Sequence, residues 1–175
     1  MNHAGAIIMP YKGIMPTIHP EAFIAPGAVV IGDVHIGRES NVWFGCVIRG
    51  DVNTIRIGAR TNIQDGTIVH VTRETGPTVI GSGITIGHKV MLHACTLEDE
   101  CFIGMNATII DGVVVERSAF VAAGSMVPPN KRIPGGQMWA GNPAKYFRDL
   151  KPQELDFIPV SAQHYVDLAN EYKPA

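Results

Sequence analysis

Three of the seven histidines stand where they could bind one metal ion together. His70 and His93 each directly follow an aliphatic residue of a regular series, and His88 stands two positions after another member of that series. Zinc bound by three neutral imidazoles keeps an open position, where the pKa of a bound water falls to about 7. The histidines therefore predict a centre that activates water, with three unrelated polar side chains on an exposed face as the alternative.

The aliphatic series that places these histidines repeats every six residues. Its members are Ile18, Ile24, Val30, Ile36, Val42 and Ile48, then Ile57, Ile63 and Val69, then Ile80, Ile86 and Leu92, then Leu97, Ile103, Ile109, Val115, Val121 and Val127. Six residues turn an α-helix by about 600°, so the period is not helical. It fits coils of three short strands, with one aliphatic side chain filling each corner of a triangular prism.

The composition also favours β structure. The chain has 20 isoleucines and 17 valines but five leucines, and side chains branched at Cβ pack well on pleated surfaces. The position four residues after each series aliphatic is usually small. Together these patterns resemble the hexapeptide-repeat family of left-handed parallel β-helices over residues 18–130. We therefore expect an all-β fold with a lead-in over residues 1–17 and an exit segment and C-terminal helix over residues 131–175.

The breaks in the series predict where the chain leaves the coils. Residues 72–79 fit no hexapeptide, so a loop is expected just after His70. Prolines after Met126 are expected to end the solenoid, because proline cannot donate to a strand ladder. The tail has helical spacing, and we expect Pro159 to split it, with Ser161 as the N-cap of the second half. The helix should pack on the flank of the prism or of a neighbouring copy.

The bulk properties exclude several classes of protein. A net charge of −2 does not fit a nucleic-acid surface or a polybasic membrane patch. The start of the chain lacks the features of a secretory signal, and no stretch approaches the roughly 20 apolar residues of a membrane span. The three cysteines Cys46, Cys95 and Cys101 form no CxxC pair, so neither a disulfide scaffold nor a thiolate zinc site is expected. We expect a cytoplasmic protein in which Cys46 and Cys101 only fill small core positions.

The positions of the three histidines within their coils predict an oligomer. His70 and His93 emerge from equivalent positions, so they should lie on one face about one coil apart. His88 stands at a different position and should point elsewhere, away from the other two histidines of its own chain. It could reach the same pair on a neighbouring chain, and a triangular prism makes a three-fold assembly natural.

The motifs around the histidines resemble those of the γ-class carbonic anhydrases. The resemblance lies in Arg49-Gly50-Asp51, in Asn62-Ile63-Gln64-Asp65-Gly66 followed by His70, in Gly87-His88 and in Leu92-His93-Ala94. It implies a homotrimer with a metal ion at each of three subunit interfaces. His70 and His93 of one subunit and His88 of the next would be the ligands. Zinc is the expected metal, although three histidines also accept cobalt or iron.

The same resemblance implies the reaction and the roles of the surrounding residues. A zinc-bound hydroxide would attack carbon dioxide and form bicarbonate. Gln64 would orient the hydroxide or the carbon dioxide through its amide, and Asn62 would support the site. Arg49 would act at the subunit interface, with Asp51 and Asp65 as its carboxylate partners.

The chain departs from the family's pattern at the residues associated with proton removal. Val52 stands where the family has a glutamate directly after the aspartate of the first motif. The acidic loop after the first histidine is also missing, and Glu74 is the acid left in that stretch. Glu74 is therefore a substitute candidate for accepting the proton, and Tyr165 from the tail is a candidate for closing over the metal. These departures leave metal binding intact but weaken the expectation of fast turnover.

Two other classes of function stay open at this point. Hexapeptide proteins include acyltransferases that use coenzyme A, and the segment Ala140-Gly141-Asn142-Pro143-Ala144-Lys145 resembles their C-terminal ending. A thioesterase that uses the same metal site is a related possibility. The third reading is a non-catalytic trimeric protein that binds a metal or siderophore or serves as an assembly subunit.

Overall fold

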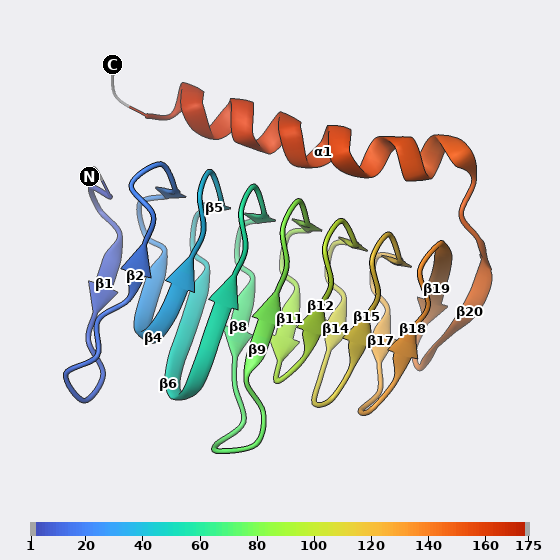
Figure 1. Cartoon of the computed structure of the whole chain (residues 1–175), viewed down its shortest axis with the longest axis horizontal. Helices are drawn as coiled ribbons and strands as arrows, with labels where there is room; N and C mark the ends of the chain where they lie inside the picture. Colours follow the sequence, from blue (N-terminus) through green and yellow to red (C-terminus); the bar gives the residue numbers. More distant parts are fainter. Residues whose placement is uncertain (1–2, 174–175) are drawn as a thin grey trace.

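The computed structural model describes residues 3–173 and is a left-handed parallel β-helix of about seven turns with one C-terminal helix (Figure 1). The three faces of the solenoid are built from short strands that pair in parallel with the same face of the next coil. The predicted fold class is confirmed. The regular six-residue spacing explains it, because every coil then repeats the same turns and presents its aliphatic residues at the same corners.

The strands of each face follow one another along the solenoid. The first face holds β1 (Ile7–Met9), the start of β4 (Val29–Ile36), the start of β6 (Val47–Ile57), β8 (Ile68–His70), β11 (Met91–His93), β14 (Thr108–Ile109) and β17 (Met126–Val127). The second holds β2 (Thr17–Ile18), the ends of β4 and β6, β9 (Thr78–Ile80), β12 (Thr96–Leu97), β15 (Val114–Val115) and β18 (Arg132–Ile133). The third holds β3 (Phe23–Ile24), β5 (Asn41–Val42), β7 (Asn62–Ile63), β10 (Thr85–Ile86), β13 (Phe102–Ile103), β16 (Phe120–Val121) and β19 (Gln137–Gly141).

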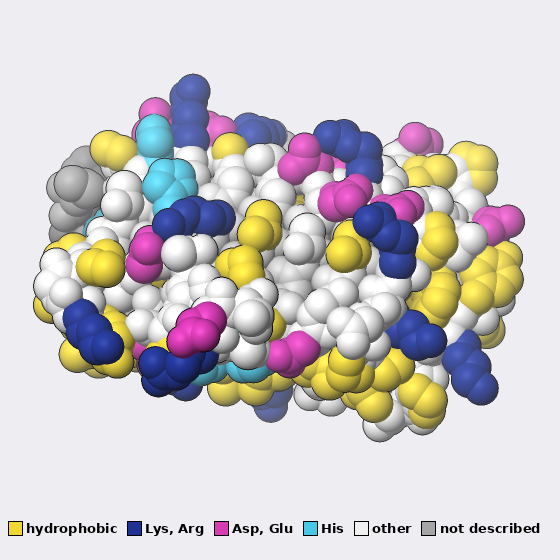
Figure 2. Space-filling model, turned by 60° about the horizontal axis from the view of Figure 1, so that its bottom comes forward, with side chains coloured by type: hydrophobic (Ala, Val, Ile, Leu, Met, Phe, Trp, Pro, Cys, Tyr) yellow, Lys and Arg dark blue, Asp and Glu magenta, His cyan; other side chains and the backbone are white. Residues whose placement is uncertain are grey.

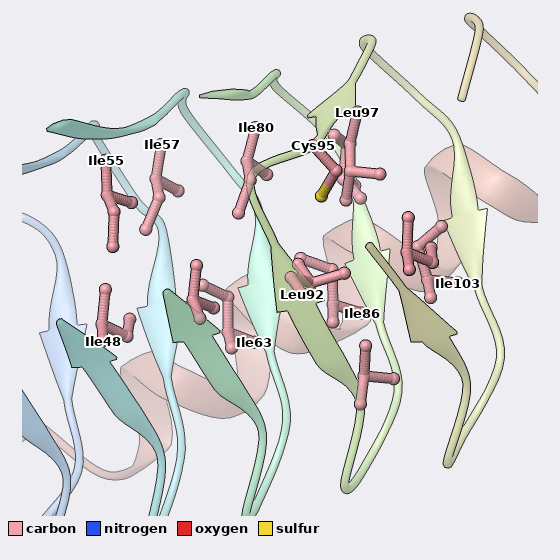
Figure 3. Packing of buried hydrophobic residues seen from close by; sticks show 14 of the residues in the cluster. Ile48, Ile55, Ile57, Ile63, Ile80, Ile86, Leu92, Cys95, Leu97 and Ile103 are labelled. Carbon is pink, nitrogen blue, oxygen red and sulfur yellow. The ribbon is translucent and has the colours of Figure 1, made fainter. Parts of the chain in front are cut away.

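The series aliphatics fill the interior of the prism, as Figure 3 shows for the central coils. Ile63, Ile86 and Ile103 are register partners on successive coils and are buried. Burying one such side chain contributes roughly 1.5–3 kcal/mol to the free energy of unfolding. The same column of stacked aliphatic side chains continues along the solenoid. Cys46 and Cys101 are also buried and free, and burial raises the pKa of the Cys46 thiol to about 11. Both thiols therefore stay protonated and behave as small core residues.

Glycines at the corners allow neighbouring coils to approach closely. A Cβ atom added to Gly87 would lie 2.6 Å from the backbone nitrogen of Met105 on the next coil. The backbone cannot move away without breaking the ladder, so the position requires glycine. This requirement matters for the site because His88 follows directly.

Parallel pairing extends beyond residues 18–130 at both ends. β1 pairs with β4 before residue 18, and β18 and β19 continue the ladder after residue 130 despite the prolines there. β20 (Ala144–Asp149) then turns back antiparallel to β19. The loop expected after His70 is present and lies between β8 and β9 (Figure 1), where Thr72 and Gly76 form an isolated bridge.

The helix α1 (Pro152–Glu171) runs back along the third face as one uninterrupted element (Figure 1). The predicted break at Pro159 and the N-cap at Ser161 are wrong. Pro159 is exposed, so water can hydrogen-bond to the backbone carbonyl that the proline leaves without an N–H partner. Ile158, Ala162 and Val166 are buried against the solenoid, and this packing keeps the helix continuous.

Arginine side chains make two of the polar contacts that hold α1 to the rest of the chain. Arg148 donates twice to Glu154, with both distances 2.7 Å, and Arg60 donates to Gln163. Within residues 3–173, no helix has the length and apolar character needed to cross a membrane. On the face in Figure 2, basic and acidic side chains are interspersed with apolar ones instead of gathering in one basic patch.

Candidate metal centre

His70 and His93 lie side by side on the first face. They are register partners on β8 and β11, and their ring centroids are 5.3 Å apart. Their side chains are 19% and 30% exposed, so both rings can still be reached from outside the prism. The ladder therefore gives this pair the matched positions expected from the sequence, one coil apart.

Each of these two imidazoles has a carboxylate partner from a neighbouring coil. His70 Nε2 lies 3.0 Å from Asp51 Oδ1, and His93 Nδ1 lies 2.8 Å from Asp111 Oδ2. A carboxylate in this position fixes the ring orientation and the tautomer, and leaves the second ring nitrogen with its lone pair available. That second nitrogen, Nδ1 of His70 and Nε2 of His93, can then bind a metal ion. The donor set therefore fits a zinc site.

His88 lies at the corner between β10 and β11, apart from the other two histidines. Its Nδ1 is 2.8 Å from Asp65 Oδ2, and its side chain is 43% exposed. Across the described part of the chain, no three His, Cys, Asp or Glu side chains are grouped so that they could hold a metal ion. One chain therefore presents two candidate ligands on one face and a third on a corner.

Gln64 and Asn62 form a buried hydrogen-bonded pair. Gln64 Nε2 donates to Asn62 Oδ1 over 3.0 Å, and Asn62 Nδ2 donates to the Ile84 carbonyl (3.3 Å) and to Thr85 Oγ1 (3.0 Å). A backbone carbonyl can only accept, so Asn62 must face it with its NH2 group. The Asn62 oxygen then faces Gln64, whose own NH2 group must donate. The Gln64 carbonyl oxygen is consequently the end that points away from Asn62.

Tyr165 reaches the same region from α1. A groove of about 380 Å³ between α1 and the solenoid is lined by Gln64, His88 and Tyr165 together with apolar side chains that include Phe102 and Met105. Burial raises the pKa of the Tyr165 phenol, and the nearby Asp65 carboxylate raises it further. Tyr165 is thus a neutral hydroxyl beside His88 at ordinary pH, and not beside the His70–His93 pair of the same chain.

The predicted partners of Arg49 are found in part. Arg49 pairs with Asp51, whereas Asp65 contacts His88 and not Arg49 within the chain. Burial raises the pKa of Asp51, but hydrogen bonds from His70 and Arg49 outweigh it, and the pKa lies below its usual value. Asp51 is therefore a carboxylate held between a candidate ligand and a cation.

The two positions associated with proton removal differ in their surroundings. Val52 is partly buried and packs against the core. Glu74 is exposed in the middle of the loop that begins after His70. The loop therefore presents one carboxylate to solvent, while the Val52 position presents an apolar side chain.

Asp111 was not anticipated from the sequence. It contacts His93 and also accepts from Thr72 Oγ1 over 2.6 Å. The hydrogen bond from Thr72 lowers the pKa of Asp111, and the contact with His93 acts in the same direction. The signal that could have found it is its spacing of 18 residues from His93, which is one full coil.

Comparison with known proteins identifies the family. Residues 15–50 match the family described as bacterial transferase hexapeptide (six repeats). Gamma carbonic anhydrase 1 of Arabidopsis thaliana, named as mitochondrial, is 54% identical over 90% of this chain. Protein YrdA of Escherichia coli is 41% identical over 95% of this chain and 94% of its own length. The chain belongs to the γ-class carbonic anhydrase-like family of hexapeptide-repeat proteins.

A solved structure of the same family has the same fold. The hexapeptide transferase family protein from Anaplasma phagocytophilum superposes with a TM-score of 0.93 at 43% identity, covering 95% of this chain and 98% of its own. The chain spans about three fifths (59%) of the length of gamma carbonic anhydrase 1 of Arabidopsis thaliana. The names given to relatives include both anhydrase and transferase, so the names alone do not determine the chemistry.

Proposed function

We propose that the protein is a metal-dependent carbonic anhydrase that interconverts carbon dioxide and bicarbonate at sites shared between the subunits of a homotrimer. The observation that carries the proposal is the arrangement of the three histidines. His70 and His93 form a pair with carboxylate partners on one face, and His88, also with a carboxylate partner, lies on a corner. A second copy that brings its corner to this face completes a three-histidine site.

The ligand set determines what metal chemistry is available. Zinc held by three neutral imidazoles supplies a hydroxide nucleophile near neutral pH. Asp51, Asp65 and Asp111 keep His70, His88 and His93 oriented and in one tautomer, so each ring is preorganised before the metal arrives. Arg49 offsets the charge of Asp51.

Gln64 presents its carbonyl oxygen, a hydrogen-bond acceptor, to the site. Its NH2 group is engaged with Asn62, so its carbonyl oxygen faces the groove that contains His88. A carbonyl oxygen accepts the hydrogen of a reacting water and thereby orients it. This supports the first of the two roles expected for Gln64, orientation of the nucleophile rather than of carbon dioxide. Tyr165 lines the same groove and has a hydroxyl that can serve the same purpose.

Proton removal is the step for which this chain has the fewest candidate groups. Val52 provides no carboxylate, and Glu74 is the acid on the exposed loop after His70. We assign Glu74 as the group that passes the proton to buffer. The cytoplasmic location expected from the sequence stays a prediction, and the Arabidopsis relatives are named mitochondrial.

Stopped-flow hydration of carbon dioxide, with metal content determined on the same sample, tests the proposal. We expect hydration that scales with bound zinc and that disappears, together with the metal, in His93→Ala. The control is His35→Ala, because His35 is an exposed histidine of β4 that has no part in the site. Three metal ions per trimer without hydration would refute the anhydrase assignment and favour another substrate or a binding role. Absence of metal in the unmodified protein would refute the site itself.

A further inference from the structure

A chain of hydrogen bonds links the C-terminal helix to Gln64. Ser161 Oγ on α1 lies 2.9 Å from Thr85 Oγ1 on β10. Thr85 Oγ1 accepts from Asn62 Nδ2 over 3.0 Å, and Asn62 Oδ1 accepts from Gln64 Nε2 over 3.0 Å. The four side chains therefore form one continuous path from the helix to the groove.

All four side chains of this path are buried. Ser161 is 6% exposed, Gln64 is 5% exposed, and Thr85 and Asn62 are 1% and 0% exposed. Buried polar groups that lose a partner cost free energy, so each member constrains the orientation of the next. A hydroxyl has one hydrogen and accepts at its lone pairs, so Thr85 can accept from Asn62 and still bond to Ser161.

We propose that Ser161 and Thr85 are positioning residues that hold the Gln64 amide with its carbonyl oxygen toward the reacting water. This inference rests on the proposed function for its catalytic consequence, but the orientation itself does not depend on it. Thr85 gives Asn62 its shorter hydrogen bond, since the alternative acceptor, the Ile84 carbonyl, lies 3.3 Å away. Ser161 on α1 contacts Thr85 in turn, so the position of the helix and the orientation of Gln64 are coupled.

Three variants test the path. Thr85→Val removes the hydroxyl but keeps the branched shape that suits a strand, Thr85→Ser keeps the hydroxyl, and Ser161→Ala removes the contribution of the helix. The matched control is Gln163→Ala, which breaks a different polar contact between α1 and the solenoid, the one from Arg60. Metal content and thermal stability are measured for every variant on the intact oligomer.

Two readouts separate this inference from the proposed function. The first is side-chain amide exchange of Gln64, followed by NMR in ¹⁵N-labelled protein. We expect its NH2 hydrogens to exchange slowly in the unmodified protein and faster in Thr85→Val and Ser161→Ala, with Thr85→Ser and Gln163→Ala unchanged. The second is carbon dioxide hydration, for which kcat should fall roughly 10-fold in Thr85→Val at full metal content and recover in Thr85→Ser.

The combined results decide between the explanations. Faster Gln64 exchange in a protein that never hydrates carbon dioxide would support the path and refute the proposed function. Unchanged Gln64 exchange in both Thr85→Val and Ser161→Ala would overturn the path whatever the activity. A loss of activity in Gln163→Ala equal to that in Ser161→Ala would also overturn it, because helix packing alone would then explain the effect.

Discussion

His93 and His70 are register partners on adjacent coils, and their ring centroids lie 5.3 Å apart. Neighbouring strands are about 4.8 Å apart, so the strand ladder itself sets this separation without any help from a loop. The same regularity explains why one chain does not complete the site. A third histidine would need to approach the pair from outside the face, and in the proposed assembly His88 of another copy takes that place.

The carboxylate beside His93 should control metal affinity. Asp111→Asn keeps the size of the side chain but removes the charge that holds the His93 ring. We expect zinc affinity to fall roughly 10- to 100-fold, because partners of metal ligands have effects of this size. Competition with a chelator measures the change. Asp99→Asn is the control, because Asp99 is a half-buried carboxylate that contacts Ser82 and Arg117 and no histidine. Equal affinities for the two variants would contradict the role given to Asp111.

The close approach of coils at Gly87 should make that position intolerant of any side chain. Gly87→Ala places a Cβ atom 2.6 Å from the Met105 backbone nitrogen, and overpacking of this kind costs about 1–3 kcal/mol. We expect a lower thermal midpoint and weaker metal retention, because the shift displaces His88. Gly124→Asn is the control, since that corner is open and asparagine tolerates positive φ. A Gly87→Ala protein as stable as the control would show that the coils can separate.

Proton transfer through Glu74 should appear as a dependence on buffer. In Glu74→Gln the loop keeps its shape but loses its carboxylate. We expect hydration to fall at least about 10-fold in weak buffer and to recover in concentrated imidazole, which accepts the proton directly. Stopped-flow rates across a buffer series measure this. A loss that persists in concentrated buffer would assign Glu74 a structural role, and no loss at all would remove it from the mechanism.

The attachment of α1 should depend on pH through Glu154. Hydrogen bonds from Arg148 and from the Lys151 backbone hold the pKa of Glu154 at about 2. A carboxylate whose pKa is lowered by folding stabilises the fold at pH values above its pKa in the unfolded chain, which is about 4.3. This stabilisation is lost as the pH falls toward 2. Glu154→Gln should therefore lower the thermal midpoint at pH 7, and its difference from the unmodified protein should shrink below about pH 4. A difference that does not vary with pH would contradict this linkage.

The parts of the site that follow from strict periodicity could be predicted from the sequence. The six-residue series places His70 and His93 at equivalent positions, and stacking of successive coils brings those positions side by side. Asp111 obeys the same periodicity but could not be recognised from the series, because it lies one coil after His93 and no histidine stands beside it in the sequence. A search for acids one coil from each histidine would have found it.

The parts that depend on packing between elements could not be predicted in the same way. Local propensity places a helix break at Pro159, but burial of Ile158 and Ala162 on the third face outweighs the lost hydrogen bond. Ser161 then turns its hydroxyl to the solenoid and contacts Thr85, a residue 76 positions away. No local sequence pattern predicts that contact, because it forms only when the helix packs on the solenoid.

A mixed-subunit experiment tests most directly whether the metal site is shared between chains. His88→Ala and His93→Ala are co-expressed with different tags, and trimers that carry both tags are purified. Each variant alone should lack metal and hydration. In every trimer that carries both tags, one of the three interfaces joins an intact His70–His93 pair to an intact His88, so about a third of the zinc and of the carbon dioxide hydration should return. Mixed trimers that stay as empty and inactive as the parent variants would contradict the account.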